Sequence, residues 1–257
     1  MDAKPWPLRK LGLKVLDLEP EVGYYEELGL ASLEKDAEHA LLGFQGKPVL
    51  ELRPLGPAGR RRPPHTAGLY HFALLLPDEP ALGAWLRRCA ERGIPLDGAS
   101  DHLVSQAIYL SDPEGNGIEV YADRPRETWT HDGDRIRMAT LPLDFDALMR
   151  QADGVLDRFP ETSRLGHMHL NVGDLERAVD FYTELGQGVT AAIGPFGFTS
   201  WDGYHHHMGL NLLQGRGASP VAEDVAGLEF FEIARPGLEP GEIRDPDGIS
   251  IRIASSS

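Results

Sequence analysis

Two segments of this chain place an ionisable side chain inside a run of apolar residues. His71 lies within the stretch GLYHFALLLP that begins at Gly68, and Glu119 lies between Ile118 and Val120. An ionised glutamate that is buried in a strand must be balanced by a cation or by hydrogen bonds. A metal ion bound by both residues would provide this balance. The alternative is that Glu119 faces solvent and that His71 is an ordinary core histidine.

Five further histidines lie within residues 167–207. His167 and His169 are two positions apart in a predicted strand, so they share one face. If the triplet His205-His206-His207 also lies in a strand, His205 and His207 share a face and His206 takes the other. An exposed polar strand is the alternative for the triplet. Two histidines and one carboxylate form the ligand set of non-haem Fe(II), and this chain can supply the set only by combining segments.

An internal duplication defines the elements that must position these side chains. The first pattern begins at Asp17 and is repeated 157 residues later from Asp174. It consists of an acidic helix start, an aromatic pair and a Leu-Gly helix end. A second pattern, a GLxxF strand followed by an aspartate-proline-acid-glycine turn, begins at Gly68 and again at Gly227. The order of the copies is therefore A, B, A′, B′.

Each copy is predicted to form a βαβββ module. We place module 1 at residues 1–63, module 2 at 64–125, module 3 at 164–220 and module 4 at 221–257. Module 4 is shortened and has largely lost its helix. Residues 126–163 contain too many apolar side chains for a solvated linker, so we expect a structured connector with a helix from Asp146 to Phe159.

The composition excludes several classes of protein. A net charge of −15 repels the phosphates of nucleic acid, and no apolar run approaches the roughly 18 residues of a membrane span. The first 13 residues lack the apolar centre of a secretory leader, so we expect a cytoplasmic protein. The single cysteine, Cys89, is predicted to be a buried helix residue, and any metal ligands must therefore be His, Asp or Glu.

Five motifs resemble those of the vicinal oxygen chelate superfamily, which contains glyoxalases, bleomycin resistance proteins and extradiol dioxygenases. Within it the chain is most similar to the catechol 2,3-dioxygenase branch. The resemblance implies an α+β fold in which paired βαβββ modules form two cupped mixed-sheet barrels, one of them around a metal. The motifs lie at Gly68–Pro77, Gly98–Ser105, Gly115–Pro125, Gly166–Leu170 and Gly203–His207.

The resemblance also implies roles for individual residues. The positions that match the metal ligands of extradiol enzymes are His71, Glu119 and His167. The acid-base histidine matches the His206-His207 pair, with His207 favoured and His206 as the alternate. Tyr109, ten residues before Glu119, matches a tyrosine beside the substrate oxygen, and His102 matches another polar residue that lines the site.

One departure from the family pattern predicts how the modules pair. Modules 3 and 4 cannot hold a metal together, because module 4 has Phe230 and Arg252 at the ligand positions. Module 1 cannot complete a site with module 2, because it has Lys10 at the position that matches His167. The complete ligand set requires module 2 to pair with module 3, which leaves module 1 to pair with module 4. This 2+3 and 1+4 hypothesis requires the ligand nitrogens of His71 and His167 to lie within about 4 Å, because each ligand bond is about 2.1 Å long.

The function implied by the resemblance is Fe(II)-dependent cleavage of a catechol-type aromatic ring with O2. The partners are then a small aromatic diol and O2, and the sequence is compatible with a homo-oligomer. One alternative is a glyoxalase-type lyase or isomerase that uses Mn, Zn, Ni or Co. Another is a resistance protein that sequesters a small molecule without chemistry, although such a pocket needs none of the ionisable residues above.

Overall fold

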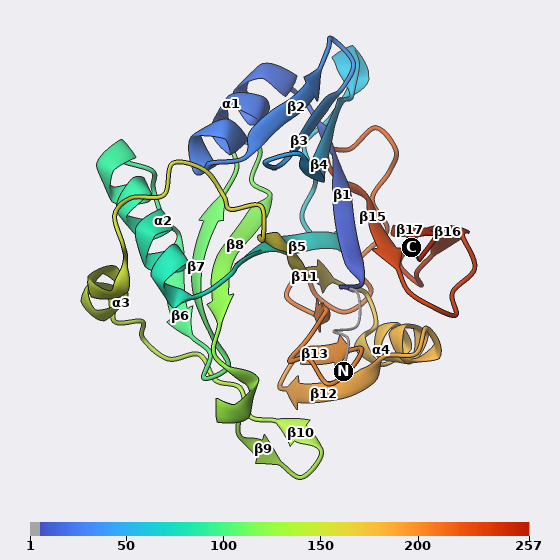
Figure 1. Ribbon diagram of the computed structural model, residues 1–257. Coiled ribbons are helices and arrows are strands. Elements are labelled where there is room, and N and C mark those ends of the chain that lie inside the picture. The colour runs from blue at the N-terminus through green and yellow to red at the C-terminus, as the bar shows by residue number, and fades with distance from the viewer. Residues whose placement is uncertain (1–5, 257) are drawn as a thin grey trace.

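A computed structural model describes residues 6–256. Within these residues the chain forms two large mixed sheets, a small hairpin and four α-helices (Figure 1). Residues 1–5, which belong to the segment in which we expect no secretory leader, lie outside the described residues. Among residues 6–256, no helix has the length and apolar character that crossing a bilayer requires.

The first sheet joins the two ends of the described chain. Its order is β16-β17-β15-β1-β4-β3-β2, and its centre is the antiparallel pair of β1 and β15. Module 1 and module 4 are therefore partners. The strands are β1 (Leu8–Val15), β2 (Ala31–Lys35), β3 (Ala40–Phe44), β4 (Lys47–Pro54), β15 (Gly227–Ala234), β16 (Gly241–Arg244) and β17 (Ser250–Ala254).

The second sheet is built in the same way from the two middle modules. Its order is β12-β13-β14-β11-β5-β8-β7-β6, with the antiparallel pair of β11 and β5 at its centre. The 2+3 and 1+4 pairing is thereby confirmed. The strands are β5 (Gly68–Leu76), β6 (Gly98–Asp101), β7 (Ser105–Ser111), β8 (Gly117–Asp123), β11 (Arg164–Asn171), β12 (Gly188–Ile193), β13 (Phe196–Ser200) and β14 (Met208–Asn211).

The three longer helices each follow the first strand of a module. They are α1 (Leu18–Leu28), α2 (Glu79–Arg92) and α4 (Leu175–Glu184), whereas residues 227–254 of module 4 form only strands and turns. The side chains of Asp78 and Asp174 cap α2 and α4 by accepting a hydrogen bond from the backbone N–H three residues later. Cys89 is buried on α2, as expected.

The connector contains a shorter helix than the sequence predicts. Helix α3 (Phe145–Gln151) ends eight residues before Phe159, and Gly154 then adopts a left-handed backbone with φ of 76°. The remaining residues form backbone hydrogen bonds with both halves: Leu156 N–H donates to Ala84 and Phe159 N–H donates to Gly29. A helix extended to Phe159 was therefore the wrong prediction, because tertiary contacts replace helical ones. The connector is nevertheless structured. It also includes η2 (Arg126–Thr128) and the hairpin β9 (His131–Asp132) and β10 (Arg135–Ile136).

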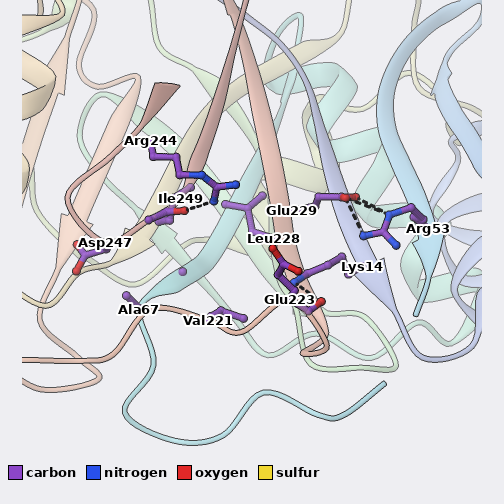
Figure 2. A pocket seen from close by; sticks show the side chains of 12 residues that line it. Lys14, Arg53, Ala67, Val221, Glu223, Leu228, Glu229, Arg244, Asp247 and Ile249 are labelled. Carbon is purple, nitrogen blue, oxygen red and sulfur yellow. Dashed lines mark hydrogen bonds and ion pairs between the residues drawn. The ribbon is translucent and has the colours of Figure 1, made fainter. Parts of the chain in front are cut away.

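A cavity of about 220 Å³ opens beside the first sheet (Figure 2). Its walls carry charges that are largely satisfied within the protein. Arg53 forms an ion pair with both carboxylate oxygens of Glu229, and Lys14 Nζ donates to two backbone carbonyls. The cavity is lined by Lys14, Arg53, Ala67, Gly68, Val221, Glu223, Leu228, Glu229, Arg244, Asp247, Gly248 and Ile249.

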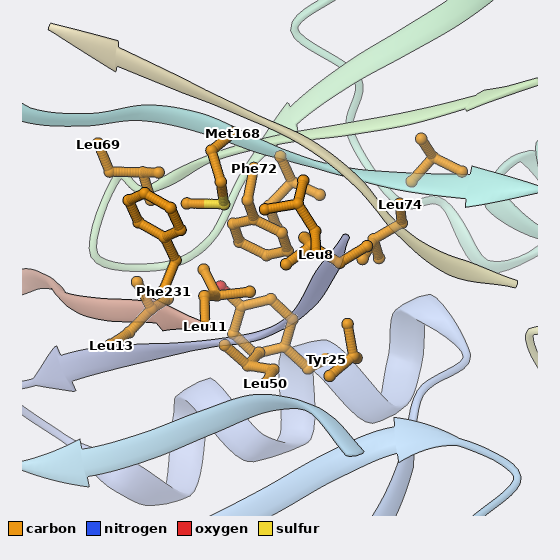
Figure 3. Close-up of a cluster of buried hydrophobic side chains, with 14 of the residues drawn as sticks. Leu8, Leu11, Leu13, Tyr25, Leu50, Leu69, Phe72, Leu74, Met168 and Phe231 are labelled. Carbon is orange, nitrogen blue, oxygen red and sulfur yellow. The ribbon is translucent and has the colours of Figure 1, made fainter. Parts of the chain in front are cut away.

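One hydrophobic core joins the two sheets. Side chains of β1 and α1 pack against those of β5 and β11, as Figure 3 shows for Leu11, Tyr25, Phe72 and Met168. All four side chains are fully buried. Because this core belongs to both halves, the two sheets are packed against each other through buried apolar side chains.

Candidate metal centre

Three buried side chains converge on one point of the second sheet. Nε2 of His71 lies 3.0 Å from Oε2 of Glu119 and 3.4 Å from Nε2 of His167. Nε2 of His167 lies 3.2 Å from the same carboxylate oxygen. No other group of three metal-ligating side chains gathers so closely in the described part of the chain.

The register of three adjacent strands produces this convergence. Strands β11 and β5 are antiparallel, with His169 opposite His71 and His167 opposite Ala73. Strand β8 runs parallel to β5 on its other side and places Glu119 beside Ala73. Because side chains alternate along a strand, one face of the three strands carries the whole cluster.

Spacing and chemistry fit a metal ion. Ligand atoms about 2.1 Å from one ion lie about 3.0 Å apart at adjacent corners of an octahedron, and about 3.4 Å apart in a tetrahedron. The three observed separations, 3.0, 3.2 and 3.4 Å, cover this interval. Two imidazoles and one carboxylate on one side also leave positions open for other ligands.

The electrostatics of the cluster favour the protonation states that a metal requires. Burial lowers the pKa of His167 to about 4, against the opposing effect of Glu119. Burial alone would raise the pKa of Glu119, but His167 and His71 outweigh it and hold that pKa well below its usual range. A neutral imidazole and an ionised carboxylate are the forms that bind metal.

Tyr109 and His102 lie together beside the cluster. The Tyr109 phenol is 2.6 Å from Nε2 of His102, its ring centroid is 5.7 Å from that of His71, and Tyr109 pairs with Glu119 across β7 and β8. Burial, reinforced by Glu119, raises the pKa of Tyr109 well above its usual value. Tyr109 therefore remains a protonated donor at the edge of the site.

The histidine triplet does not lie in a strand, and the predicted alternation is wrong. Asp202 and Gly203 have φ values of 58° and 65°, and strand β14 begins only at Met208. The turn that results places the ring of His206 4.1 Å from the ring of His167. The favoured His207 instead packs against aromatic side chains, and its Nδ1 accepts a hydrogen bond from the Trp201 N–H and lies 2.8 Å from Ser200 Oγ. The structure thus places the alternate residue, His206, against the cluster.

His169 lies at the cluster although we predicted no role for it from the sequence. Its ring centroid is 4.8 Å from that of His71 and 5.1 Å from that of Tyr70. Burial lowers the pKa of His169 well below its usual value, and its Nε2 has no hydrogen-bond partner among the described residues. The shared face of His167 and His169 was the signal that pointed to this position.

The corresponding point of the first sheet is filled by an aromatic ring. Phe230 is fully buried where the second sheet has His71. Arg252 lies over this ring in the position of Glu119, and Lys10 lies near it in the position of His167. Cations and a phenyl ring cannot bind a metal ion, so the first sheet has no metal centre at this point. The cavity in Figure 2 belongs to this half, and none of the three cluster residues lines it.

A comparison with protein families identifies the superfamily of the chain. The model of the Glyoxalase/Bleomycin resistance protein/Dioxygenase superfamily matches residues 8–120 and 164–222. These ranges make up more than half of the chain and contain all three cluster residues. The chain belongs to this superfamily.

Individual relatives agree with this assignment. The catechol-2,3-dioxygenase of Bacillus subtilis (strain 168) is 41% identical over 234 residues, which span 88% of this chain and 82% of that protein. A crystal structure of a Bacillus subtilis protein superposes with a TM-score of 0.62 at 14% identity and covers 98% of this chain and 86% of its own. Glyoxalase I from Zea mays gives a TM-score of 0.56 at 17% identity over 96% and 91% of the two chains. Both structures show the same fold.

Proposed function

We propose that the protein is an Fe(II)-dependent extradiol dioxygenase that opens the ring of a catechol with O2. The observation that carries this proposal is the convergence of His71, Glu119 and His167 on one buried point. The relative that is 41% identical bears the name of the same activity. A set of only three protein ligands leaves room for a diol and O2, and this favours the dioxygenase over a glyoxalase-type enzyme, which we expect to use a fourth.

Each side chain of the site has a distinct proposed task. His71, Glu119 and His167 hold the metal, and their burial keeps water from the reacting atoms. When bound, Fe(II) would supply the redox chemistry and orient the substrate. Nδ1 of His102 donates to the carbonyl of Ala139, so its Nε2 accepts the O–H of Tyr109 and fixes the position of that phenol through a 2.6 Å hydrogen bond. When substrate binds, the Tyr109 O–H turns from His102 to donate to a substrate oxygen.

We propose His206 as the acid-base residue. Its ring lies against that of His167, and burial, followed by the neighbouring histidines, lowers its pKa well below the usual value. A neutral imidazole can accept a proton from the substrate hydroxyl at Nε2 and return it to the opening ring. His207 lacks this position, because it packs against Trp201 and Tyr204.

The proposal is tested with protein that is loaded with Fe(II) without oxygen and then mixed with catechol. Admission of O2 should produce a coloured ring-opened semialdehyde, with one O2 consumed for each catechol. The His71→Ala variant should bind no iron and form no product, whereas the exposed His131→Ala variant should retain both properties. Absence of colour and O2 uptake with catechol and with a panel of substituted catechols, although iron is bound, would refute the activity.

A further inference from the structure

A chain of side-chain hydrogen bonds leads from the end of β8 to His206. Nε2 of His205 lies 2.9 Å from Oδ1 of Asp123, and Nδ1 of His205 lies 2.8 Å from Nδ1 of His206. His205 is buried with 1% of its surface exposed, and Asp123 keeps about a quarter of its side chain exposed. Because Asp123 belongs to module 2 and the histidines to module 3, the chain of bonds exists only when these modules pair.

The direction of each hydrogen bond follows from the chemistry of its members. A carboxylate offers only acceptors, so His205 must donate from Nε2 to Asp123. A neutral imidazole that carries its proton on Nε2 has a lone pair on Nδ1. In the Nδ1 to Nδ1 contact the donor must then be His206, which leaves Nε2 of His206 unprotonated. No described residue forms a hydrogen bond with this nitrogen.

We propose that Asp123 and His205 are positioning residues that fix the orientation and tautomer of His206, so that its Nε2 presents a lone pair. A catalytic role for this lone pair rests on the proposed function, because a base needs a free lone pair to take a proton from a catechol hydroxyl. The tautomer itself does not depend on that function. Without His205, the His206 ring could turn or could place its proton on either nitrogen.

The surroundings of His205 are built to hold this arrangement. The Tyr204 ring lies 4.0 Å from the His205 ring, and the Tyr204 phenol donates to the same Asp123 oxygen and contacts the phenol of Tyr121. A side chain at Gly166 would put Cβ 2.1 Å from the Tyr121 oxygen, so the glycine before His167 keeps this network intact. The Asp123 carboxylate therefore accepts hydrogen bonds from both Tyr204 and His205.

The tautomer can be measured directly by long-range ¹H–¹⁵N correlation NMR on metal-free protein with labelled histidine. We expect a pyridine-type Nε2 and a pyrrole-type Nδ1 for His206, and the reverse for His205. A matched pair of variants tests the cause. In His205→Gln the amide can donate to Asp123 and accept from His206, so the tautomer should persist, whereas in His205→Leu it should become a mixture.

Kinetics on the iron-loaded variants give a second readout. His205→Leu and Asp123→Leu should lower kcat about tenfold, part of what general base catalysis contributes, with KM for catechol changed less than about twofold. His205→Gln should recover most of kcat. The control Tyr204→Phe removes the phenol that donates to Asp123 but keeps the ring against His205 and the hydrogen bond between His205 and Asp123, and it should leave the tautomer of His206 unchanged.

The outcomes separate this proposal from the proposed function. A pyrrole-type Nε2 on His206 in the wild-type protein overturns the assignment, and this measurement needs no variant to fold. An unchanged tautomer in folded His205→Leu shows that His205 does not set it, and also overturns the assignment. If the tautomers are as expected but no catechol is cleaved, the positioning stands and the proposed dioxygenase activity fails.

Discussion

The guanidinium of Arg252 lies 3.4 Å from the centroid of the Phe230 ring. Lys10 places a second cation 5.6 Å from the same ring, and Gly12 provides the space that the ring occupies, because a Cβ there would lie 2.2 Å from it. Cation–π attraction and burial thus stabilise the first sheet at the position equivalent to the ligand cluster of the second sheet. At this position the first sheet has a packed aromatic side chain in place of metal ligands.

Truncation of Phe230 should therefore destabilise the fold without removing the metal centre. Phe230→Ala leaves a cavity beside Gly12 and should lower the free energy of unfolding by about 3–5 kcal/mol, measured by chemical denaturation. Phe230→Leu should cost clearly less, because it keeps most of the volume. Iron bound per folded protein should remain that of the wild type in both variants. A loss of iron from folded Phe230→Leu would contradict the division between the halves.

Metal binding should stabilise the folded protein. At a free Fe(II) concentration one hundred times the Kd, a ligand that binds only the native state adds about 2.7 kcal/mol, equivalent to a rise in Tm of about 5–10 °C for a chain of this size. Differential scanning under anaerobic conditions would measure it. A chelator should reverse the rise, His71→Ala should abolish it and His131→Ala should preserve it. An equal rise in His71→Ala would place the metal elsewhere.

Much of the fold could be predicted from the sequence because the duplication repeats both turn residues and apolar positions. The module pairing followed from the ligand positions that the family resemblance implies, because Lys10, Phe230 and Arg252 at those positions cannot hold a metal and only modules 2 and 3 have a complete ligand set. The structure confirms this pairing, and its strand register brings His71 and His167 within 3.4 Å.

The parts that the sequence could not supply depend on contacts between distant residues. Alternation along a strand was a reasonable assumption for the histidine triplet, but the turn at Asp202 and Gly203 breaks it. The bond between His205 and Asp123 joins residues 82 positions apart, and no local pattern indicates such a contact. The choice between His206 and His207 as the residue nearest the cluster was therefore open until the turn was known.

Removal of the Tyr109 hydroxyl should impair catalysis more than binding of metal. Tyr109→Phe deletes the donor beside the cluster and leaves His102 without its 2.6 Å partner. We expect kcat/KM for catechol to fall about tenfold to hundredfold, somewhat less than the loss of a dedicated transition-state donor, with iron content unchanged. The matched change Tyr182→Phe lies at the contact of α4 with Asp245 and should affect stability rather than rate. Equal rates for wild type and Tyr109→Phe would exclude the proposed donor role.

Glu21 is a buried acid that disfavours folding at neutral pH. It lies on α1 with no exposed surface, and neither carboxyl oxygen has a hydrogen-bond partner among the described residues. Burial, followed by the charges of Asp112 and Glu114, raises its pKa to about 9. The corresponding residue of module 3, 157 positions later, is Ala178, so the repeat itself does not require an acid here.

The sign of the pH dependence follows from this raised pKa. Below the ordinary value of 4.5 the acid is protonated in both the folded and unfolded states, and its contribution to stability is fully present. Between about 4.5 and 9 the unfolded chain releases the proton and the folded protein retains it, so stability falls as pH rises. Glu21→Gln mimics the protonated acid and should remove this loss.

The variant Glu21→Gln should therefore be more stable than the wild type at neutral pH. We expect a gain of up to about 3 kcal/mol at pH 7, from about 1.36 kcal/mol for each pH unit above the unfolded pKa, and little gain at pH 5. Denaturant unfolding at the two pH values measures the difference. Glu26→Gln, an exposed change on the same helix, should give no comparable gain at either pH. A Glu21→Gln protein that is less stable than the wild type at pH 7 would show that Glu21 is ionised and stabilised in the folded state, contrary to the raised pKa.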